Sequence, residues 1–166
     1  MKKLYSLVIG IALLITAATT ASAFDNLTPV QAYDAVVNNG AYILDVRTDA
    51  EFIWVGHPNV INVLNISYKI ENKDTLITNP SFISDIDEIF GAVKDTHIIT
   101  MCRSGQRSVE AALALEAAGY TNVSNMVDGF EGGKKDQYGY RTINGWKNSG
   151  LPGHTSSVGA DDYYSD

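Results

Sequence analysis

The stretch HIITMCRSGQRSVEAALALEAAGY, residues 97–120, decides the fold of this chain. It opens with a short apolar run, residues 97–101, which predicts a buried strand. Residues 108–118 are strong helix formers, and Gly119 is placed to end that helix. The loop 102–108 lies between them, so the single cysteine, Cys102, stands where a strand ends and a helix is about to begin.

The rest of the chain repeats this alternation of strands and helices. Further strands are predicted at residues 41–46, 60–66 and 122–127. Helices are predicted at residues 28–37, from Thr48 onward, and at 79–90. The first two helices begin with capping boxes, formed by Thr28 with Gln31 and by Thr48 with Glu51.

Strands that alternate with helices predict an α/β fold, a parallel β-sheet with helices on both faces. The carboxyl ends of parallel strands lie along one edge of the sheet, where such folds bind ligands. The segments that leave strand ends should therefore gather on one face, and they begin at Arg47, Ser67, Cys102 and Asp128.

Composition and charge narrow the class of protein. The chain has 166 residues with 12 Lys+Arg and 19 Asp+Glu, a formal charge of −7, which argues against a nucleic-acid partner. A single cysteine excludes an internal disulfide framework, a cysteine-cluster zinc site and a two-cysteine redox relay. The three histidines, His57, His97 and His154, show no metal-ligand spacing, so we expect no metal and no cofactor.

The amino-terminal residues resemble a targeting sequence rather than part of the fold. Residues 1–23 combine two lysines, a short apolar run and an Ala-Ser-Ala end, the pattern of a secretory signal peptide. The run is too short for a spanning helix, so we expect no membrane attachment after cleavage. The chain then divides into the signal peptide, one domain at residues 24–152 and a flexible acidic tail at 153–166. We expect export, most simply to the periplasm of a Gram-negative bacterium.

The loop 102–108 has the composition of an anion-binding turn. Backbone N–H groups of the turn and of the following helix end can point at one spot, aided by the helix dipole. Gly105 permits a tight turn, and Arg103 and Arg107 add positive charge. Such surroundings favour a reactive thiolate on Cys102. The alternative is a buried cysteine that only fills space.

Several motifs together resemble a single-domain rhodanese, a sulfurtransferase. They are Asp45-Val46-Arg47, Glu51, Gly56-His57, the loop Cys102-Arg103-Ser104-Gly105-Gln106-Arg107-Ser108, and Gly150-Leu151-Pro152. The resemblance covers about residues 28–152 and implies a parallel α/β sheet and a persulfide on Cys102. It also implies a small anionic sulfane donor such as thiosulfate, with a thiol or other thiophilic acceptor. Residues 103–108 would bind the donor, with Arg103 and Arg107 at its sulfonate end.

Two alternative functions stay open from the sequence. A cysteine phosphatase or arsenate reductase would wrap an oxyanion in a Cys-x5-Arg loop, whereas Arg107 follows Cys102 after four residues and Ser108 takes the phosphatase arginine's place. The shorter loop favours sulfur over phosphate. A non-catalytic carrier would hold the same persulfide and deliver it only to a partner protein.

Other polar residues allow a functional or a structural interpretation. Asp45 and Arg47 lie at a strand end and either shape the pocket or form a structural pair, with Glu51 near Arg47. We expect His57 to be a hydrogen-bonded structural side chain, because a preformed thiolate needs no base. The loop 129–145 either rims the active site with Tyr138, Tyr140 and Arg141 or is a solvated excursion.

Overall fold

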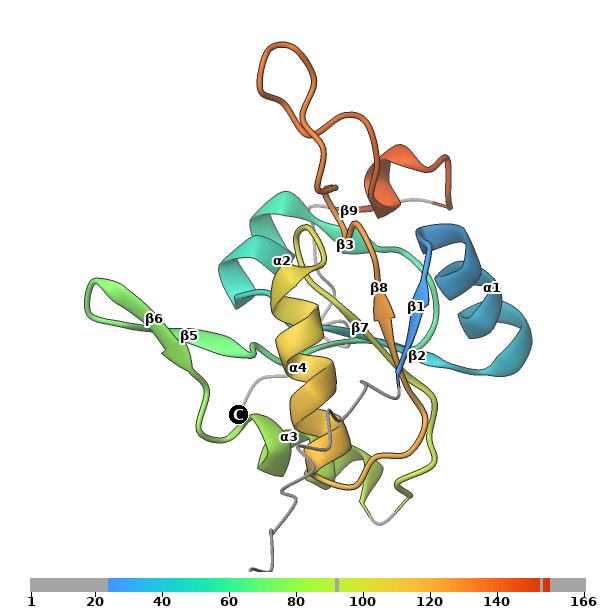
Figure 1. Cartoon of the computed structure of the whole chain (residues 1–166), viewed down its shortest axis with the longest axis vertical. Helices are drawn as coiled ribbons and strands as arrows, with labels where there is room; N and C mark the ends of the chain where they lie inside the picture. The colour runs from blue at the N-terminus through green and yellow to red at the C-terminus, as the bar shows by residue number, and fades with distance from the viewer. Residues whose placement is uncertain (1–23, 92, 153, 156–166) are drawn as a thin grey trace, which may run out of the picture.

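A parallel sheet organises the part of the chain that the computed structural model describes, residues 24–91, 93–152 and 154–155. Five strands lie in the order β1-β8-β7-β2-β4, and every neighbouring pair is parallel. Their bounds are β1 Asp25–Leu27, β2 Tyr42–Asp45, β4 Val63–Asn65, β7 Ile98–Met101 and β8 Val123–Met126. The predicted α/β class with a parallel sheet is confirmed (Figure 1).

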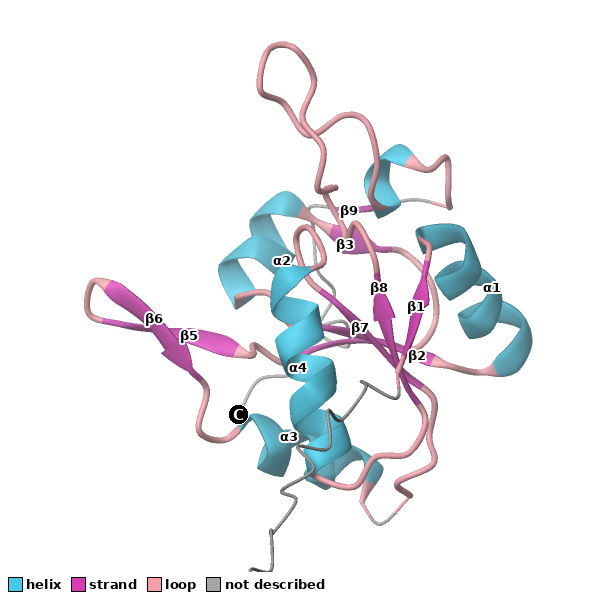
Figure 2. Ribbon diagram, viewed as in Figure 1, coloured by secondary structure: helices cyan, strands magenta, loops and turns pink. Residues whose placement is uncertain are grey.

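Helices flank this sheet (Figure 2). They are α1 Pro29–Asn39, α2 Asp49–Val55, α3 Phe82–Phe90 and α4 Gln106–Ala117, with a 3₁₀ turn at Trp146–Asn148. The side chains of neighbouring strand residues separate into two clusters: Leu44 packs with α3 and α4, and Ile43 packs with α1. Because successive strand residues point to opposite faces, α1 covers one face and α3 with α4 covers the other.

The helix ends follow the sequence closely. Both capping boxes form, with the N–H groups of Gln31 and Glu51 donating to the hydroxyls of Thr28 and Thr48. Helix α4 starts at Gln106, two residues before the predicted start, because Gly105 takes a left-handed conformation with φ 94°. The loop that follows β7 is correspondingly shorter than the sequence indicated.

Three features of the strands differ from prediction. Strand β1 was not predicted, because it has only three residues. The strand predicted at residues 60–66 is regular only at Val63–Asn65, since Asn62 has a φ of 58° that interrupts the extended chain. A hairpin, β5 Lys69–Asn72 with β6 Thr75–Thr78, fills a segment for which no element was expected, because its polar sequence lacks a buried apolar run.

One further pairing joins the last described residues to the segment that follows α2. Strand β9, His154–Thr155, pairs antiparallel with β3, His57–Pro58, inside the segment predicted to be a free tail. The predicted signal peptide at residues 1–23 and the remainder of the predicted tail lie outside the described residues. Within the described residues, none of the helices has the length and apolarity needed to cross a membrane.

Candidate active site

Cys102 lies at the carboxyl end of β7, immediately before the turn into α4. Its Sγ accepts a hydrogen bond from the backbone N–H of Gly105 at 3.2 Å and another from the Ser108 hydroxyl at 3.4 Å. Two donors from the predicted loop therefore face the sulfur, and hydrogen bonds of this kind stabilise an anionic sulfur over a neutral one.

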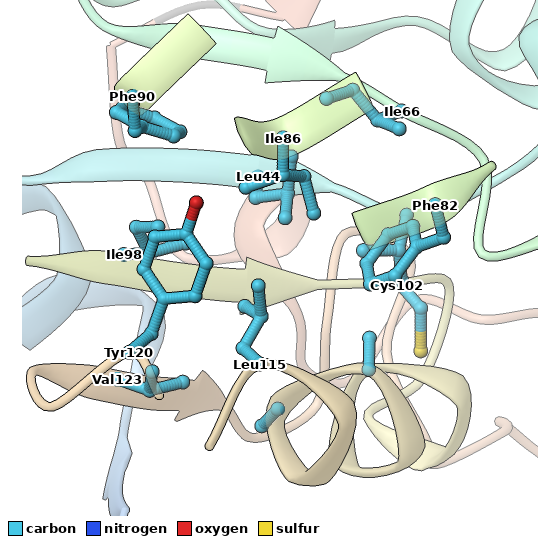
Figure 3. Packing of buried hydrophobic residues seen from close by; sticks show 13 residues of the cluster. Leu44, Ile66, Phe82, Ile86, Phe90, Ile98, Cys102, Leu115, Tyr120 and Val123 are labelled. Atoms are coloured by element: carbon cyan, nitrogen blue, oxygen red, sulfur yellow. The ribbon is translucent and has the colours of Figure 1, made fainter. Parts of the chain in front are cut away.

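The thiol is nevertheless buried, which the sequence did not predict. Cys102 is 1% exposed and belongs to the apolar cluster between the sheet and α3 and α4. Figure 3 shows it beside Phe82, with its sulfur directed toward α4. One side of the residue is thus packed like a core cysteine, while its sulfur meets polar donors.

The amino-terminal end of α4 supplies the rest of the anion cradle. Gly105 at the N-cap contributes no side chain, and no side chain caps this end within the described residues. The first N–H groups of a helix have no partner inside the helix, and the helix dipole places positive charge there. In this turn Ser104 is half-buried and Gln106 is exposed, and their predicted role in donor binding stays a prediction.

The segment that follows β8 is hydrogen-bonded to the backbone of the cysteine loop. Phe130 N–H donates to the carbonyl of Cys102 at 2.8 Å, and the N–H groups of Glu131 and Gly132 donate to the carbonyl of Arg103. A Cβ on Gly129 would lie 2.2 Å from the Cys102 carbonyl oxygen, so only glycine allows this approach. We call residues 129–132 the strap. The predicted crowding of strand ends is confirmed here, because the segment that leaves β8 lies beside Cys102 as expected and its backbone binds the cysteine loop directly.

Asp45 and Arg47 form a buried pair that packs against Phe130 of the strap. Both are fully buried, and the Arg47 Nε donates to the Asp45 carboxylate at 2.9 Å. The guanidinium also donates to the Gly56 carbonyl and stacks over the ring of Phe130 at 4.5 Å. The Asp45–Arg47 pair therefore contacts the cysteine loop indirectly: Arg47 packs on the ring of Phe130, and the N–H of Phe130 donates to the Cys102 carbonyl.

The structural pair of Asp45 with Arg47 forms with Glu51 near it, and the ion-pair partner of Glu51 is Arg107. The two Arg107 nitrogens donate to the two Glu51 oxygens at 2.7 Å each. Burial alone would raise the pKa of Glu51, but the hydrogen bonds and charge of Arg107, with the Thr48 N–H and the charge of Arg47, lower it below the usual range. The same pairing raises the pKa of Arg107.

This ion pair changes what the two arginines of the loop can do. Arg107 has its guanidinium committed to Glu51, so it is a weaker candidate for donor binding than the sequence indicated. Arg103 is exposed and has no ion-pair partner among the residues that the structure describes. Its charge is therefore available to an incoming anion.

An open cleft of about 530 Å³ lies beside the loop. Arg103 and Arg107 line it, together with Thr48 and Glu51 from the start of α2 and the turn of the β5–β6 hairpin. Segments that leave β2, β4 and β7 thus meet at this cleft. The sequence placed these segments on one face but gave no indication of the hairpin that closes the cleft.

The remaining candidates lie away from the sulfur. His57 is buried, stacks on Phe52 at 4.1 Å and contacts the Pro58 carbonyl through Nδ1. Tyr138 and Tyr140 are exposed on the projecting part of the 129–145 loop and do not line the cleft. In the described part of the chain, no group of three or more His, Cys, Asp or Glu side chains is arranged to hold a metal ion.

Residues 28–136 match the family model described as the rhodanese-like domain. The chain belongs to the rhodanese-like family. Among solved structures, this rhodanese-like protein is similar to a protein from M. tuberculosis, with a TM-score of 0.65 and 32% identity over 77% of this chain and 95% of that one.

Relatives of this rhodanese-like protein differ in what is known of them. An uncharacterised protein of Rickettsia prowazekii is 35% identical over 128 residues, 76% of this chain and 94% of that protein. Thiosulfate sulfurtransferase 16, chloroplastic, of Arabidopsis thaliana is 31% identical over 121 residues, 73% of this chain and 85% of the plant protein. The chain is a single rhodanese-like domain protein related to thiosulfate sulfurtransferases.

Proposed function

We propose that this protein is a sulfurtransferase that moves sulfane sulfur through a persulfide on Cys102. The donor is thiosulfate or a related small anion, and the acceptor is a thiol or another thiophile. The observation that supports this most directly is the pair of hydrogen bonds that Gly105 N–H and the Ser108 hydroxyl donate to Sγ. A cysteine that only fills space needs neither donor. The family membership and the plant sulfurtransferase relative support the same class of reaction.

The first half-reaction is a displacement at sulfur. The Cys102 thiolate attacks the outer sulfur of thiosulfate, the bond between the two thiosulfate sulfurs breaks, and sulfite leaves with that electron pair. The charge of −3 is conserved, since a thiolate and a dianion become a persulfide anion and sulfite. The N–H groups of the loop and of the α4 end would then stabilise the terminal sulfur, as an oxyanion hole stabilises a developing charge.

The second half-reaction returns the enzyme to its starting state. An acceptor thiolate attacks the terminal sulfur of the persulfide and forms a new sulfur–sulfur bond. The bond to Sγ breaks, and Cys102 leaves as a thiolate. This is covalent catalysis in two displacements and needs no general base once the thiols are ionised.

In this scheme the loop residues have separate tasks. Arg103 attracts the anionic donor by its exposed charge, and residues 104–108 form the cradle around the sulfur. Arg107, held by Glu51, adds fixed positive charge beside the cradle. Asp45 and Arg47 position the loop through Phe130, without touching the reacting atoms.

The experiment that tests this function is intact-mass measurement after treatment with thiosulfate. We expect the mass to increase by one sulfur atom, the Cys102→Ser variant to stay unmodified, and a small thiol to release the sulfur over many turnovers. Ser108→Ala should slow persulfide formation about fivefold, the effect of one lost hydrogen bond of about 1 kcal/mol. A loaded protein without turnover would be a carrier, and an unmodified protein that hydrolyses aryl phosphates would refute sulfur transfer.

We also propose that the protein works outside the cytoplasm, in the periplasm. Residues 1–23 support this by their lysine pair, apolar run and Ala-Ser-Ala end, which match a secretory signal. The test is amino-terminal sequencing of the protein from fractionated cells. A periplasmic protein that begins at Phe24 is the expected result, and a cytoplasmic protein that keeps Met1 would refute it.

A further inference from the structure

The β5–β6 hairpin stands apart from the parallel sheet and forms the far wall of the cleft. In Figure 1 it projects from the body of the domain on the side where α4 and α2 lie. The ion pair of Lys69 with Glu110 on α4, at 2.9 Å, fixes its base. Glu71 is paired in register with Leu76, so the two side chains share one face of the hairpin, and both line the cleft.

The two walls of the cleft carry opposite charge. On the loop side, Glu51 neutralises Arg107, which leaves the positive charge of Arg103. On the hairpin side, Glu71 and Asp74 outnumber Lys73, which leaves one negative charge. No salt bridge joins the hairpin turn to the loop among the described residues. Both charges are thus available to a ligand that lies between them.

Such a pair of walls does not match the donor. Thiosulfate is a dianion and gains nothing from two carboxylates opposite Arg103. A ligand with a carboxylate and an ammonium group, in contrast, can place the first on Arg103 and the second on Glu71 and Asp74. A volume of about 530 Å³ falls in the range of small-molecule sites, so the cleft accommodates a ligand of this kind.

We propose that this cleft binds the sulfur acceptor and that the acceptor is a small zwitterionic aminothiol. The proposal rests on the sulfurtransferase function, and it adds the acceptor class and the hairpin as its specificity element. The acceptor's thiolate attacks the terminal sulfur of the Cys102 persulfide, and the electron pair of the broken bond stays on Cys102. The product is the persulfide of the aminothiol, with total charge unchanged.

The test measures only the second half-reaction. The protein is loaded with thiosulfate, freed of excess donor, and mixed with one of four thiols at equal thiolate concentration. Cysteine has both charged groups, 3-mercaptopropionate lacks the ammonium, cysteamine lacks the carboxylate, and 2-mercaptoethanol has neither. We expect cysteine to discharge the persulfide fastest, by about fivefold over each thiol that lacks one group, the upper range for an exposed ion pair.

Variants of the hairpin assign the preference to its two acids. The double variant Glu71→Gln, Asp74→Asn should lower the ratio of the cysteine rate to the 3-mercaptopropionate rate about fivefold. Reversal of charge, Glu71→Lys with Asp74→Lys, should make 3-mercaptopropionate the faster acceptor. A matched control, Asp34→Asn with Glu116→Gln, removes two acids away from the cleft and should keep the wild-type ratio.

The outcomes separate this proposal from the function on which it rests. If thiosulfate leaves no sulfur on Cys102, both are refuted. If the sulfur is loaded and all four thiols remove it at similar rates, only the aminothiol proposal is refuted. A preference for cysteine that survives neutralisation and reversal of Glu71 and Asp74 would also refute it, because the hairpin would then not set the acceptor.

Discussion

Replacement of Gly129 by alanine tests whether the strap shapes the cysteine loop. Gly129 has a φ of 58°, and an added Cβ would lie 2.2 Å from the Cys102 carbonyl oxygen and 2.8 Å from the Arg103 carbonyl carbon. Real Cβ contacts stay beyond 3.0 Å, so the loop backbone must move by roughly 0.8 Å. A displacement near 1 Å in an active site costs about 100-fold in rate, and we expect persulfide formation to fall by about that factor.

The same substitution has a stability cost that divides into two parts. A left-handed conformation of alanine costs about 1 kcal/mol, and overpacking against a backbone costs about 1–3 kcal/mol more. Gly40 gives the matched control, because it has a φ of 70° and an added Cβ there meets nothing within 4 Å. Gly40→Ala should therefore lose only the stability that the left-handed alanine costs, and it should form the persulfide at the wild-type rate.

The assays are urea unfolding for stability and the time course of intact mass after thiosulfate addition for the rate. Gly129→Ala should remain folded, since domains are stable by about 5–15 kcal/mol. Equal stability of Gly129→Ala and Gly40→Ala, together with persulfide formation by Gly129→Ala within about threefold of the wild-type rate, would show that the strap does not shape the cysteine loop.

Three further predictions concern buried and paired charges. Asp45→Asn leaves the buried guanidinium of Arg47 without its counter-charge and should lower the free energy of unfolding by about 3–5 kcal/mol; a loss below about 1 kcal/mol in urea unfolding would contradict this. Because the pKa of Glu51 is lowered, its pair with Arg107 stabilises the fold above pH 4.5, the usual value, and this stabilisation is lost as the pH falls. The free energy of unfolding of Glu51→Gln should therefore fall less steeply with acid than that of the wild type. Parallel curves of unfolding free energy against pH would contradict this. Burial lowers the pKa of His97 below its usual value of 6.5, by more than the charge of Asp25 raises it. Protonation of His97 therefore destabilises the fold, and the free energy of unfolding should decrease as the pH falls below 6.5. His97→Gln should remove that decrease in thermal unfolding.

The local signals in the sequence were strong enough to fix most of the fold. The capping boxes at Thr28 and Thr48 and the apolar runs around Leu44 and Ile99 gave the helices and the central strands because each signal lies within a few residues. The β5–β6 hairpin could not be found in this way. It is stabilised by its own ladder and by Lys69 with Glu110, which are 41 positions apart, and not by an apolar run.

The candidate site was predictable in its position and less so in its contacts. The loop 102–108 is visible as a strand end followed by a helix start, and its donors face the sulfur as expected. The pairing of Glu51 with Arg107 and the strap contact at Cys102 join residues that are far apart in the chain. The glycines at 129, 132 and 133, after a predicted strand at the same sheet edge, were the one signal that pointed to the strap.

Burial of Cys102 is compatible with sulfur transfer because the atoms that cover it are apolar on one side and hydrogen-bond donors on the other. Apolar side chains pack against one side of the residue, whereas the Gly105 N–H and the Ser108 hydroxyl donate to its sulfur on the other. Those donors are held in place from behind, by Phe130 on the Cys102 carbonyl and by Arg47 on the ring of Phe130. A fixed cradle around a shielded sulfur also limits contact of the persulfide with bulk solvent. In the proposed reaction the acceptor would reach the sulfur from the cleft side, where Arg103 is exposed, so the choice of acceptor would depend on that wall and on the hairpin opposite it.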